Sequence, residues 1–146
     1  MNAALDTRPL LALVDDDSHS ARLLLRSLGD QVQARTRWLG DARRAVRLLA
    51  EVGEAGNWPE LMIVDLKSRS SATRDFIAHI RLAANENGTL IVAMAPSLER
   101  DLRDGLLEAG AAAVFERHSE INAYRREAAS IMSFWARHQR LDQVDT

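Results

Sequence analysis

Apolar runs alternate along the chain with segments of helical periodicity. Two continuous apolar runs, 10–14 and 61–64, predict strands buried on both faces of a sheet, and two further largely apolar runs, 89–94 and 112–115, predict two more strands. Elsewhere apolar residues recur every three or four positions, a spacing typical of helices, over five segments: 18–28, 41–52, 72–84, 98–109 and 119–140. The less regular segment 32–38 predicts a further strand near the sheet edge. Strands that alternate with helices in this way indicate an α/β fold with a parallel sheet covered on both faces.

The pattern also predicts details of two helices. Gly29 directly follows the first helix and predicts its C-terminal cap. The last helix is expected to bury one apolar stripe, formed by Ile121, Tyr124, Ala128, Ile131 and Trp135. Near its end, Phe134 and Trp135 are expected either to bury a contact between two copies of the chain or to fold back on the body. The sequence leaves both alternatives open.

Composition and charge narrow the class of protein. The 146 residues, 47% of them apolar, are enough for one domain with a substantial core. A net charge of -2 provides no global field that would attract nucleic acid or an anionic membrane, so we expect direct binding to neither. The absence of cysteine excludes disulfides and thiolate metal sites. No apolar run approaches the roughly 18 residues of a membrane helix, and we expect a cytoplasmic protein.

Charged residues follow three of the predicted strands. The first strand runs into Asp15, Asp16 and Asp17, the strand 61–64 ends on Asp65, and the last strand is followed by Arg117. Because the carboxyl ends of parallel strands meet at one edge, these residues predict an acidic pocket with one cation beside it. Adjacent carboxylates suit Mg2+, and Asp65 could act as metal ligand, general base or nucleophile. One of the three successive aspartates is expected only to cap the following helix.

Three other chemistries find no support in the sequence. The four histidines lie on different elements without metal-ligand spacing, which disfavours zinc. No serine stands on a sharp glycine-rich turn after a strand, and no glycine combines with a Gly-Lys-Ser or Gly-Lys-Thr sequence. Hydrolysis by a serine nucleophile and nucleotide binding by a phosphate loop are therefore disfavoured.

With these motifs, the chain resembles the receiver domain of bacterial two-component response regulators. The resemblance covers the chain from Leu10 to about Arg137 and rests on three motifs in matching order and spacing. They are Leu13-Val14-Asp15-Asp16-Asp17, Ile63-Val64-Asp65 and Glu108-Ala109-Gly110-Ala111. It implies a flavodoxin-like (βα)5 three-layer sandwich with a parallel sheet in the order 2-1-3-4-5. The expected organisation is an N-terminal arm at 1–9, a receiver domain at 10–140 and a tail at 141–146.

The resemblance also implies roles for individual residues. The position of Asp65 accepts a phosphoryl group from a sensor histidine kinase or a phosphotransfer protein. Asp15, Asp16 and Asp65 would hold Mg2+ together with the backbone carbonyl of Lys67, and Arg117 would neutralise the phosphoryl group. Such a domain is not an enzyme beyond its own phosphorylation and dephosphorylation. It could dimerise through the last helix.

The chain departs from the family pattern at several of these positions. A serine or threonine hydroxyl is usual where this chain has Ala95, and a lysine followed by proline is usual where it has Arg117 and His118. Arginine is a planar donor on a longer arm and does not replace a compact ammonium without rearrangement. Lys67 is unusual beside three carboxylates. It is either a solvated loop residue or an ammonium that acts in the pocket, where it would pair with Asp65 or a neighbour and partly replace the metal, or would attract the phosphoryl group itself.

Three hypotheses follow. The first is a phosphoacceptor in two-component signalling, with phosphoryl transfer to Asp65 in the presence of Mg2+. The second is a degenerate receiver that works as a phosphorylation-independent protein-binding or dimerisation module, which is favoured by Ala95, Arg117, His118 and Lys67. The third, a Mg2+-dependent phosphatase with Asp65 as nucleophile, lacks a second aspartate two residues later, because that position is Lys67.

Overall fold

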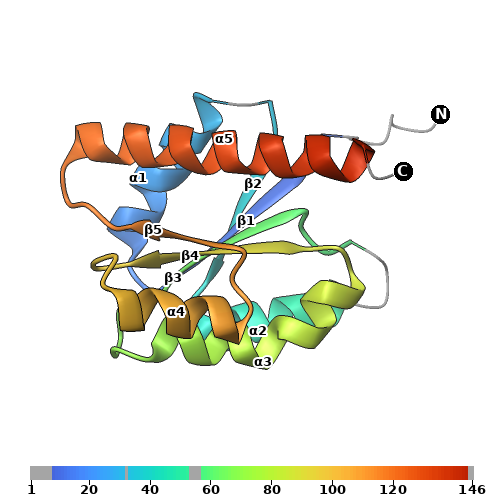
Figure 1. Cartoon of the computed structure of the whole chain (residues 1–146), viewed down its shortest axis with the longest axis horizontal. Helices are drawn as coiled ribbons and strands as arrows, with labels where there is room; N and C mark the ends of the chain where they lie inside the picture. The colour runs from blue at the N-terminus through green and yellow to red at the C-terminus, as the bar shows by residue number, and fades with distance from the viewer. Residues whose placement is uncertain (1–7, 32, 53–56, 145–146) are drawn as a thin grey trace.

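The computed structural model describes residues 8–31, 33–52 and 57–144 and contains one parallel sheet at its centre (Figure 1). Within these ranges the sheet has five strands: β1 (Leu10–Asp15), β2 (Arg35–Gly40), β3 (Leu61–Asp65), β4 (Leu90–Ala95) and β5 (Ala113–Glu116). All neighbouring strands pair in parallel, and their order across the sheet is β2-β1-β3-β4-β5. The predicted flavodoxin-like α/β fold, with its strand order 2-1-3-4-5, is therefore confirmed.

Helices cover both faces of this sheet. The part of the chain that the structure describes has five helices: α1 (Ser18–Gly29), α2 (Ala42–Val52), α3 (Ala72–Glu86), α4 (Arg100–Ala109) and α5 (Ile121–Val144). In Figure 1, α1 and α5 lie above the sheet, whereas α2, α3 and α4 lie below it. Each layer of helices closes a separate hydrophobic cluster against its own face of the sheet. The structure is a three-layer sandwich.

The central strands β1 and β3 are apolar at every position before their final aspartate, because both of their faces are buried. In β1, Leu11 and Leu13 belong to the cluster under α1 and α5, while Ala12 and Val14 belong to the cluster on the opposite face. All five residues of β3 are buried in the same way. Continuous burial of this kind is the physical reason that uninterrupted apolar runs predicted these strands correctly. Each of these two strands ends on a buried aspartate, Asp15 in β1 and Asp65 in β3.

The edge strand β2 lies further along the chain than its sequence pattern predicted. β2 spans Arg35–Gly40 instead of 32–38, and Val32 falls outside the described residues. Its first three residues are exposed, and only Leu39 and Gly40 are buried. A strand at the sheet edge has one neighbour and one solvated side, so its residues carry little apolar periodicity to mark its ends.

Three predictions about the helices were also wrong in detail. Gly29 is the last residue of α1, and the C-terminal cap is Asp30. Ile121 is 64% exposed, so the buried stripe of α5 begins at Ala123. Leu98 is exposed and precedes α4, which begins at Arg100. Helix termini have solvated backbone groups, and apolar residues within their first turn need not face the core.

The aromatic residues near the end of α5 pack on the body of the same chain. Trp135 is 8% exposed and lies in the hydrophobic cluster under α1 and α5. Phe134 makes an edge-to-face contact with Phe115 of β5, with ring centroids 6.2 Å apart. These contacts correspond to the alternative in which the two side chains fold back. Dimerisation through α5 stays a prediction. The helix itself continues to Val144, four residues beyond its predicted end.

None of the helices in the described ranges is long and apolar enough to cross a lipid bilayer.

A partly buried carboxyl on α5, that of Glu127, gives a prediction about stability. Burial raises the pKa of Glu127, and Glu116 acts in the same direction, whereas His118 and Arg126 oppose it. A raised folded-state pKa gives stability that is present at acidic pH and lost as the pH rises through that pKa. We expect Glu127→Gln to increase the free energy of unfolding at neutral pH by less than about 1 kcal/mol, because His118 and solvent screen part of the charge.

Chemical denaturation at neutral and acidic pH measures this effect. The gain should disappear at acidic pH, where the native carboxyl is protonated. Glu86→Gln on the exposed side of α3 is the matched control and should change stability equally at both pH values. A destabilisation by Glu127→Gln at neutral pH would show that the ionised carboxylate is favourably paired instead.

Candidate functional site

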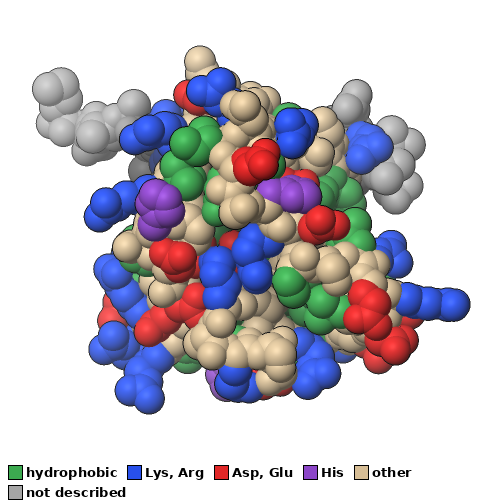
Figure 2. All heavy atoms as spheres, turned by 90° about the vertical axis from the view of Figure 1, so that its left-hand side faces the viewer, with side chains coloured by type: hydrophobic (Ala, Val, Ile, Leu, Met, Phe, Trp, Pro, Cys, Tyr) green, Lys and Arg blue, Asp and Glu red, His purple; other side chains and the backbone are tan. Residues whose placement is uncertain are grey.

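The charged residues of the sequence pattern meet at the carboxyl edge of the sheet. Asp15 and Asp65 end β1 and β3 as directly paired residues of the parallel ladder. Both are buried, with exposed fractions of 0% and 2%. Arg117 follows β5, and its backbone N–H donates to the carbonyl of Ala95 at the end of β4, with N···O 2.7 Å. Figure 2 looks onto this edge and shows basic side chains at its centre, with acidic side chains on either side.

Every oxygen of the Asp15 side chain accepts a hydrogen bond from the protein. Oδ2 accepts from the Ser20 hydroxyl at 2.7 Å. Oδ1 accepts from the backbone N–H of Asp17 at 2.9 Å and from Nζ of Lys67 at 2.6 Å. The indole of Trp38 donates to the backbone carbonyl of Asp15 at 2.9 Å, which fixes the end of β1 against β2. Asp15 is thus held rigidly in place.

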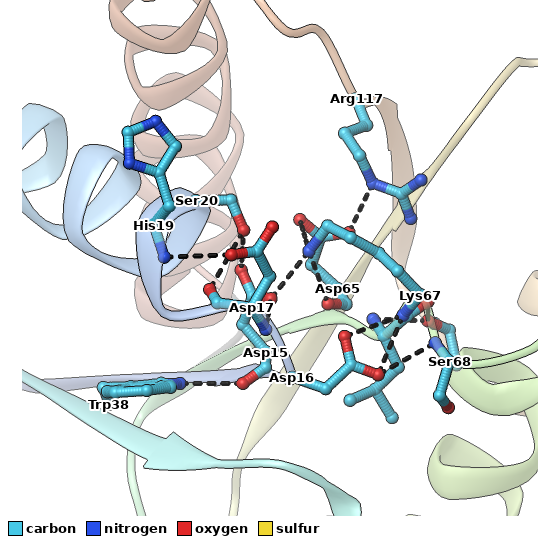
Figure 3. Close-up of polar contacts among 12 residues, drawn as sticks. Asp15, Asp16, Asp17, His19, Ser20, Trp38, Asp65, Lys67, Ser68 and Arg117 are labelled. Atoms are coloured by element: carbon cyan, nitrogen blue, oxygen red, sulfur yellow. Dashed lines mark hydrogen bonds and ion pairs between the residues drawn. The ribbon is translucent and has the colours of Figure 1, made fainter.

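The next two aspartates have different local partners. Asp17 is the N-cap of α1, and its Oδ1 accepts from the backbone N–H of His19 at 2.9 Å. It is the aspartate that only caps a helix. Asp16 reaches toward the loop after β3, where its carboxylate accepts from the backbone N–H groups of Lys67, at 3.0 and 3.1 Å, and of Ser68, at 2.9 Å. This carboxylate ties the β1–α1 loop to the β3–α3 loop (Figure 3).

Each of the two carboxylate oxygens of Asp65 forms an ion pair with a different cation. Nε of Arg117 lies 2.7 Å from Oδ1, and Nζ of Lys67 lies 3.0 Å from Oδ2. Lys67 Nζ also donates to the backbone carbonyl of Asp65 at 3.1 Å. Figure 3 shows the arginine and the lysine approaching this carboxylate from different elements. The candidate nucleophile therefore has a cation on each oxygen.

Lys67 is the centre of the cluster. Its ammonium is shared by Asp15, at 2.6 Å, and Asp65, at 3.0 Å, and its side chain is only 22% exposed. It is also the only lysine in the chain, where arginine supplies the other 18 of the 19 basic residues. A compact ammonium is the side-chain cation closest in shape to a metal ion, whereas a guanidinium is a planar fork. Of the two alternatives for this residue, the structure has the paired one.

The electrostatic balance of the cluster favours these contacts. Burial raises the pKa of Asp15, while hydrogen bonds from Lys67, Ser20 and the Asp17 backbone lower it, and the charge of Asp65 raises it further. Burial has the largest effect, so the carboxyl of Asp15 has a raised pKa despite its short contact with Lys67. A buried carboxylate pair of this kind needs nearby positive charge. Lys67 and Arg117 supply it from within the chain.

The donor atoms as they lie do not fit a divalent metal ion. Among residues 8–31, 33–52 and 57–144, no group of three His, Cys, Asp or Glu side chains is arranged to hold one. The two oxygens of Asp16 accept backbone N–H groups, and Lys67 Nζ stands between the carboxylates of Asp15 and Asp65. An oxygen-seeking cation would have to displace that ammonium. The magnesium site expected from the family resemblance would thus need a rearrangement of Lys67.

Three residues of the site were not foreseen from the sequence: Ser20, Trp38 and Thr73. Ser20 donates to Asp15 from the first turn of α1. The hydroxyl of Thr73 accepts from the backbone N–H of Leu66 at 2.9 Å and so holds the start of the loop that carries Lys67. Each is an ordinary polar residue in the sequence. Only the first-turn position of Ser20, five residues after Asp15, offered a signal.

Ala95 occupies the position at which the family pattern has a serine or threonine that takes part in the switch. It ends β4, is 1% exposed and presents only a methyl group. Ser97, two residues later, is exposed. The site therefore has no hydroxyl at the end of β4.

Comparison with known proteins identifies the fold. No family model matches the sequence, and no curated protein matches it. Solved structures do match. The phosphorylated cyanobacterial phytochrome response regulator RcpA is 20% identical, with a TM-score of 0.74 over 89% of this chain and 95% of that chain. The Mn2+-bound form of response regulator Rcp1 is 22% identical, with a TM-score of 0.70 over 87% and 94%.

A third structure covers almost the full length of this chain. It is the signal receiver domain of an HD domain-containing protein from Pseudomonas fluorescens Pf-5, which is 16% identical, with a TM-score of 0.71 over 99% of this chain and 98% of that chain. The fold of this chain is that of response regulator receiver domains.

Proposed function

We propose that this chain is a receiver-type module of two-component signalling that binds protein partners without being phosphorylated. One observation carries the proposal: the Lys67 ammonium bridges Asp15 and Asp65 while Arg117 holds the other oxygen of Asp65. In this account the two built-in cations neutralise the carboxylates and stabilise a single state of the pocket. The role is that of a signalling domain and not of a classical enzyme.

A phosphorylation-driven switch at Asp65 is disfavoured in this arrangement for two physical reasons, one that concerns phosphoryl transfer and one that concerns the response to it. A carboxylate oxygen that accepts a short bond from a cation is a weaker nucleophile, because the cation stabilises its negative charge. In addition, a switch requires a contact that differs between its two states. Ala95 offers no hydroxyl for such a contact at the end of β4.

The second candidate is a phosphoacceptor, and the position of Asp65 favours it. Asp65 ends β3 in register with Asp15, and Arg117 is close enough to pair with an added phosphoryl group. The fold is shared with one response regulator solved in a phosphorylated form and with another solved with Mn2+ bound. A sensor histidine kinase or a phosphotransfer protein would be the donor. This candidate requires Lys67 to move away from both aspartates.

Intact mass after incubation with acetyl phosphate and Mg2+ separates the two candidates. We expect no phosphoryl-sized gain in the natural chain. Lys67→Met should show such a gain in mass, because removal of the ammonium takes the cation away from Oδ2 of Asp65 and Oδ1 of Asp15. The double variant Lys67→Met with Asp65→Asn is the control for the modified position and should show none. A gain in the natural chain that disappears in Asp65→Asn would establish the phosphoacceptor instead.

A further inference from the structure

A cavity of about 260 Å3 lies beside the acidic cluster, beneath α4. Its walls come from the start of α3, the end of β4, the inner face of α4 and Arg117. Asp15, Asp16 and Asp65 do not line it. Arg117 is thus the residue that joins this cavity to the cluster, because its Nε is bound to Asp65. The cavity is a separate compartment at the edge of the sheet where α/β folds bind ligands.

Two small residues keep this cavity open. Ala95 contributes only a methyl group at the end of β4, and Gly105 contributes no side chain from the middle of α4. A Cβ atom at Gly105 would meet only the Cδ atom of Arg74, at an ordinary contact distance of 3.8 Å. Glycine weakens a helix interior relative to alanine. Neither backbone conformation nor close packing therefore explains the glycine, whereas an open cavity does.

Arg117 presents unused hydrogen-bond donors at this cavity. Its Nε donates to Asp65, and its side chain is 22% exposed. Among the described residues, no acceptor is bound to its two terminal nitrogens, which Figure 3 shows turned away from the aspartates of β1. A guanidinium held through Nε is a pre-oriented fork for a carboxylate or a phosphate group. The cavity therefore has an anion-binding group at the wall it shares with the acidic cluster.

The other lining residues limit the charge and size of a ligand. Arg74 adds one positive charge and Asp101 one negative charge, so the lining carries a net charge of +1 together with Arg117. The remaining wall is largely apolar, with contributions from Leu102 and Leu106. A volume of 260 Å3 is just below the usual range of ligand sites, which begins at about 300 Å3. These features select a small, singly charged anion with an apolar body.

We propose that this cavity binds a small organic monoanion, whose carboxylate or phosphate group pairs with Arg117 and whose apolar part packs under α4. The inference extends the proposed function, because an anion on the terminal nitrogens of Arg117 would share the positive charge of the guanidinium with Asp65, which is bound to Nε, and would weaken that ion pair. Such a ligand would change the strength of the ion pair between Arg117 and Asp65 without any covalent modification. It would therefore give a phosphorylation-independent module a means of receiving a signal.

The test adds benzoate or phenylphosphonate to the full chain as probes. Binding is measured from the chemical shifts of the backbone amide and arginine Nε–H resonances in NMR spectra. At mildly acidic pH phenylphosphonate carries mainly one charge, so the two probes distinguish a carboxylate from a phosphonate head group. We expect saturable shifts of the Arg117 Nε–H and of the Gly105 amide with at least one probe. Neutral benzyl alcohol should bind at least about tenfold more weakly, because it cannot pair with the guanidinium.

Gly105→Leu is the decisive variant, because it fills the cavity and favours the helix. The variant should no longer bind the probes, and its amide spectrum should remain that of a folded protein. Arg103→Leu introduces the same side chain on the same helix outside the cavity lining and should retain binding. Absence of saturable shifts with both anions, or equal binding by Gly105→Leu, would overturn the inference. The mass assay with acetyl phosphate is independent of these shifts, so failure of the proposed function would be recognised separately.

Discussion

Lys67→Met should lower the free energy of unfolding by about 2–4 kcal/mol in the absence of divalent cations, because it leaves two buried carboxylates without their shared ammonium. Methionine has a similar length and keeps most of the apolar contacts of the lysine stem. The full range for breaking a buried pair is about 3–5 kcal/mol, and the 22% exposure of Lys67 reduces it somewhat. Urea denaturation in the presence of a chelator measures this change directly.

Addition of Mg2+ should then restore much of the lost stability in Lys67→Met, since a ligand that binds only the folded state stabilises it. The natural chain should show no comparable response. Arg69→Met is the matched control: it removes a cation from the same loop, but one that is 62% exposed and pairs with Asp75 at the surface. Its effect should be much smaller and independent of Mg2+. Equal stability of Lys67→Met and the natural chain without metal would contradict the structural role of the ammonium.

Asp65→Asn should also destabilise the fold, by about 2–3 kcal/mol, because it removes the carboxylate that accepts a hydrogen bond from Arg117 and forms an ion pair with Lys67. The asparagine amide keeps the size of the side chain but cannot neutralise two cations. In a pocket with an excess of unpaired carboxylates, the same substitution would relieve repulsion and stabilise the protein. The sign of the change therefore distinguishes the two electrostatic arrangements. Thermal and urea denaturation in chelator provide the measurement.

Asp75→Asn is the matched control for this substitution. Asp75 also accepts from an arginine, but it lies at the surface, where Arg69 and Ser71 lower its pKa in a solvated environment. Its replacement should have a much weaker effect than replacement of Asp65. A stabilising Asp65→Asn would mean that the carboxylates repel each other despite the two cations.

The sequence predicted the fold well because burial leaves a strong periodic signal. β1 and β3 are apolar at every position that two layers of helices cover, and their ends are marked by aspartates. β2 gave a weaker signal, because Arg35 and Arg37 are exposed on an edge strand. Ile121 was misplaced for a related reason, since periodicity does not show where a helix leaves the body of the protein.

The site was predictable only as far as strand ends determine it. Asp15, Asp65 and Arg117 meet because parallel strands finish at one edge, which periodicity and connectivity already imply. The direction of the Lys67 side chain, in contrast, does not follow from the ends of the strands. It depends on the path of a loop whose backbone N–H groups donate to the Thr73 hydroxyl, on the helix that follows the loop, and to the Asp16 carboxylate, which is 51 residues away in sequence. No local pattern encodes those bonds, so the sequence left its two alternatives open.

Binding of Mn2+ at neutral pH, followed by electron paramagnetic resonance of the free ion, tests the central claim most directly. The account predicts that the natural chain leaves the signal of free Mn2+ unchanged, whereas Lys67→Met reduces it in a saturable, one-site manner. Asp15→Asn added to Lys67→Met should abolish that binding, because one of the two freed carboxylates is lost. Saturable binding of one Mn2+ by the natural chain, lost in Asp15→Asn, would contradict the account and show that the ammonium gives way to a metal ion.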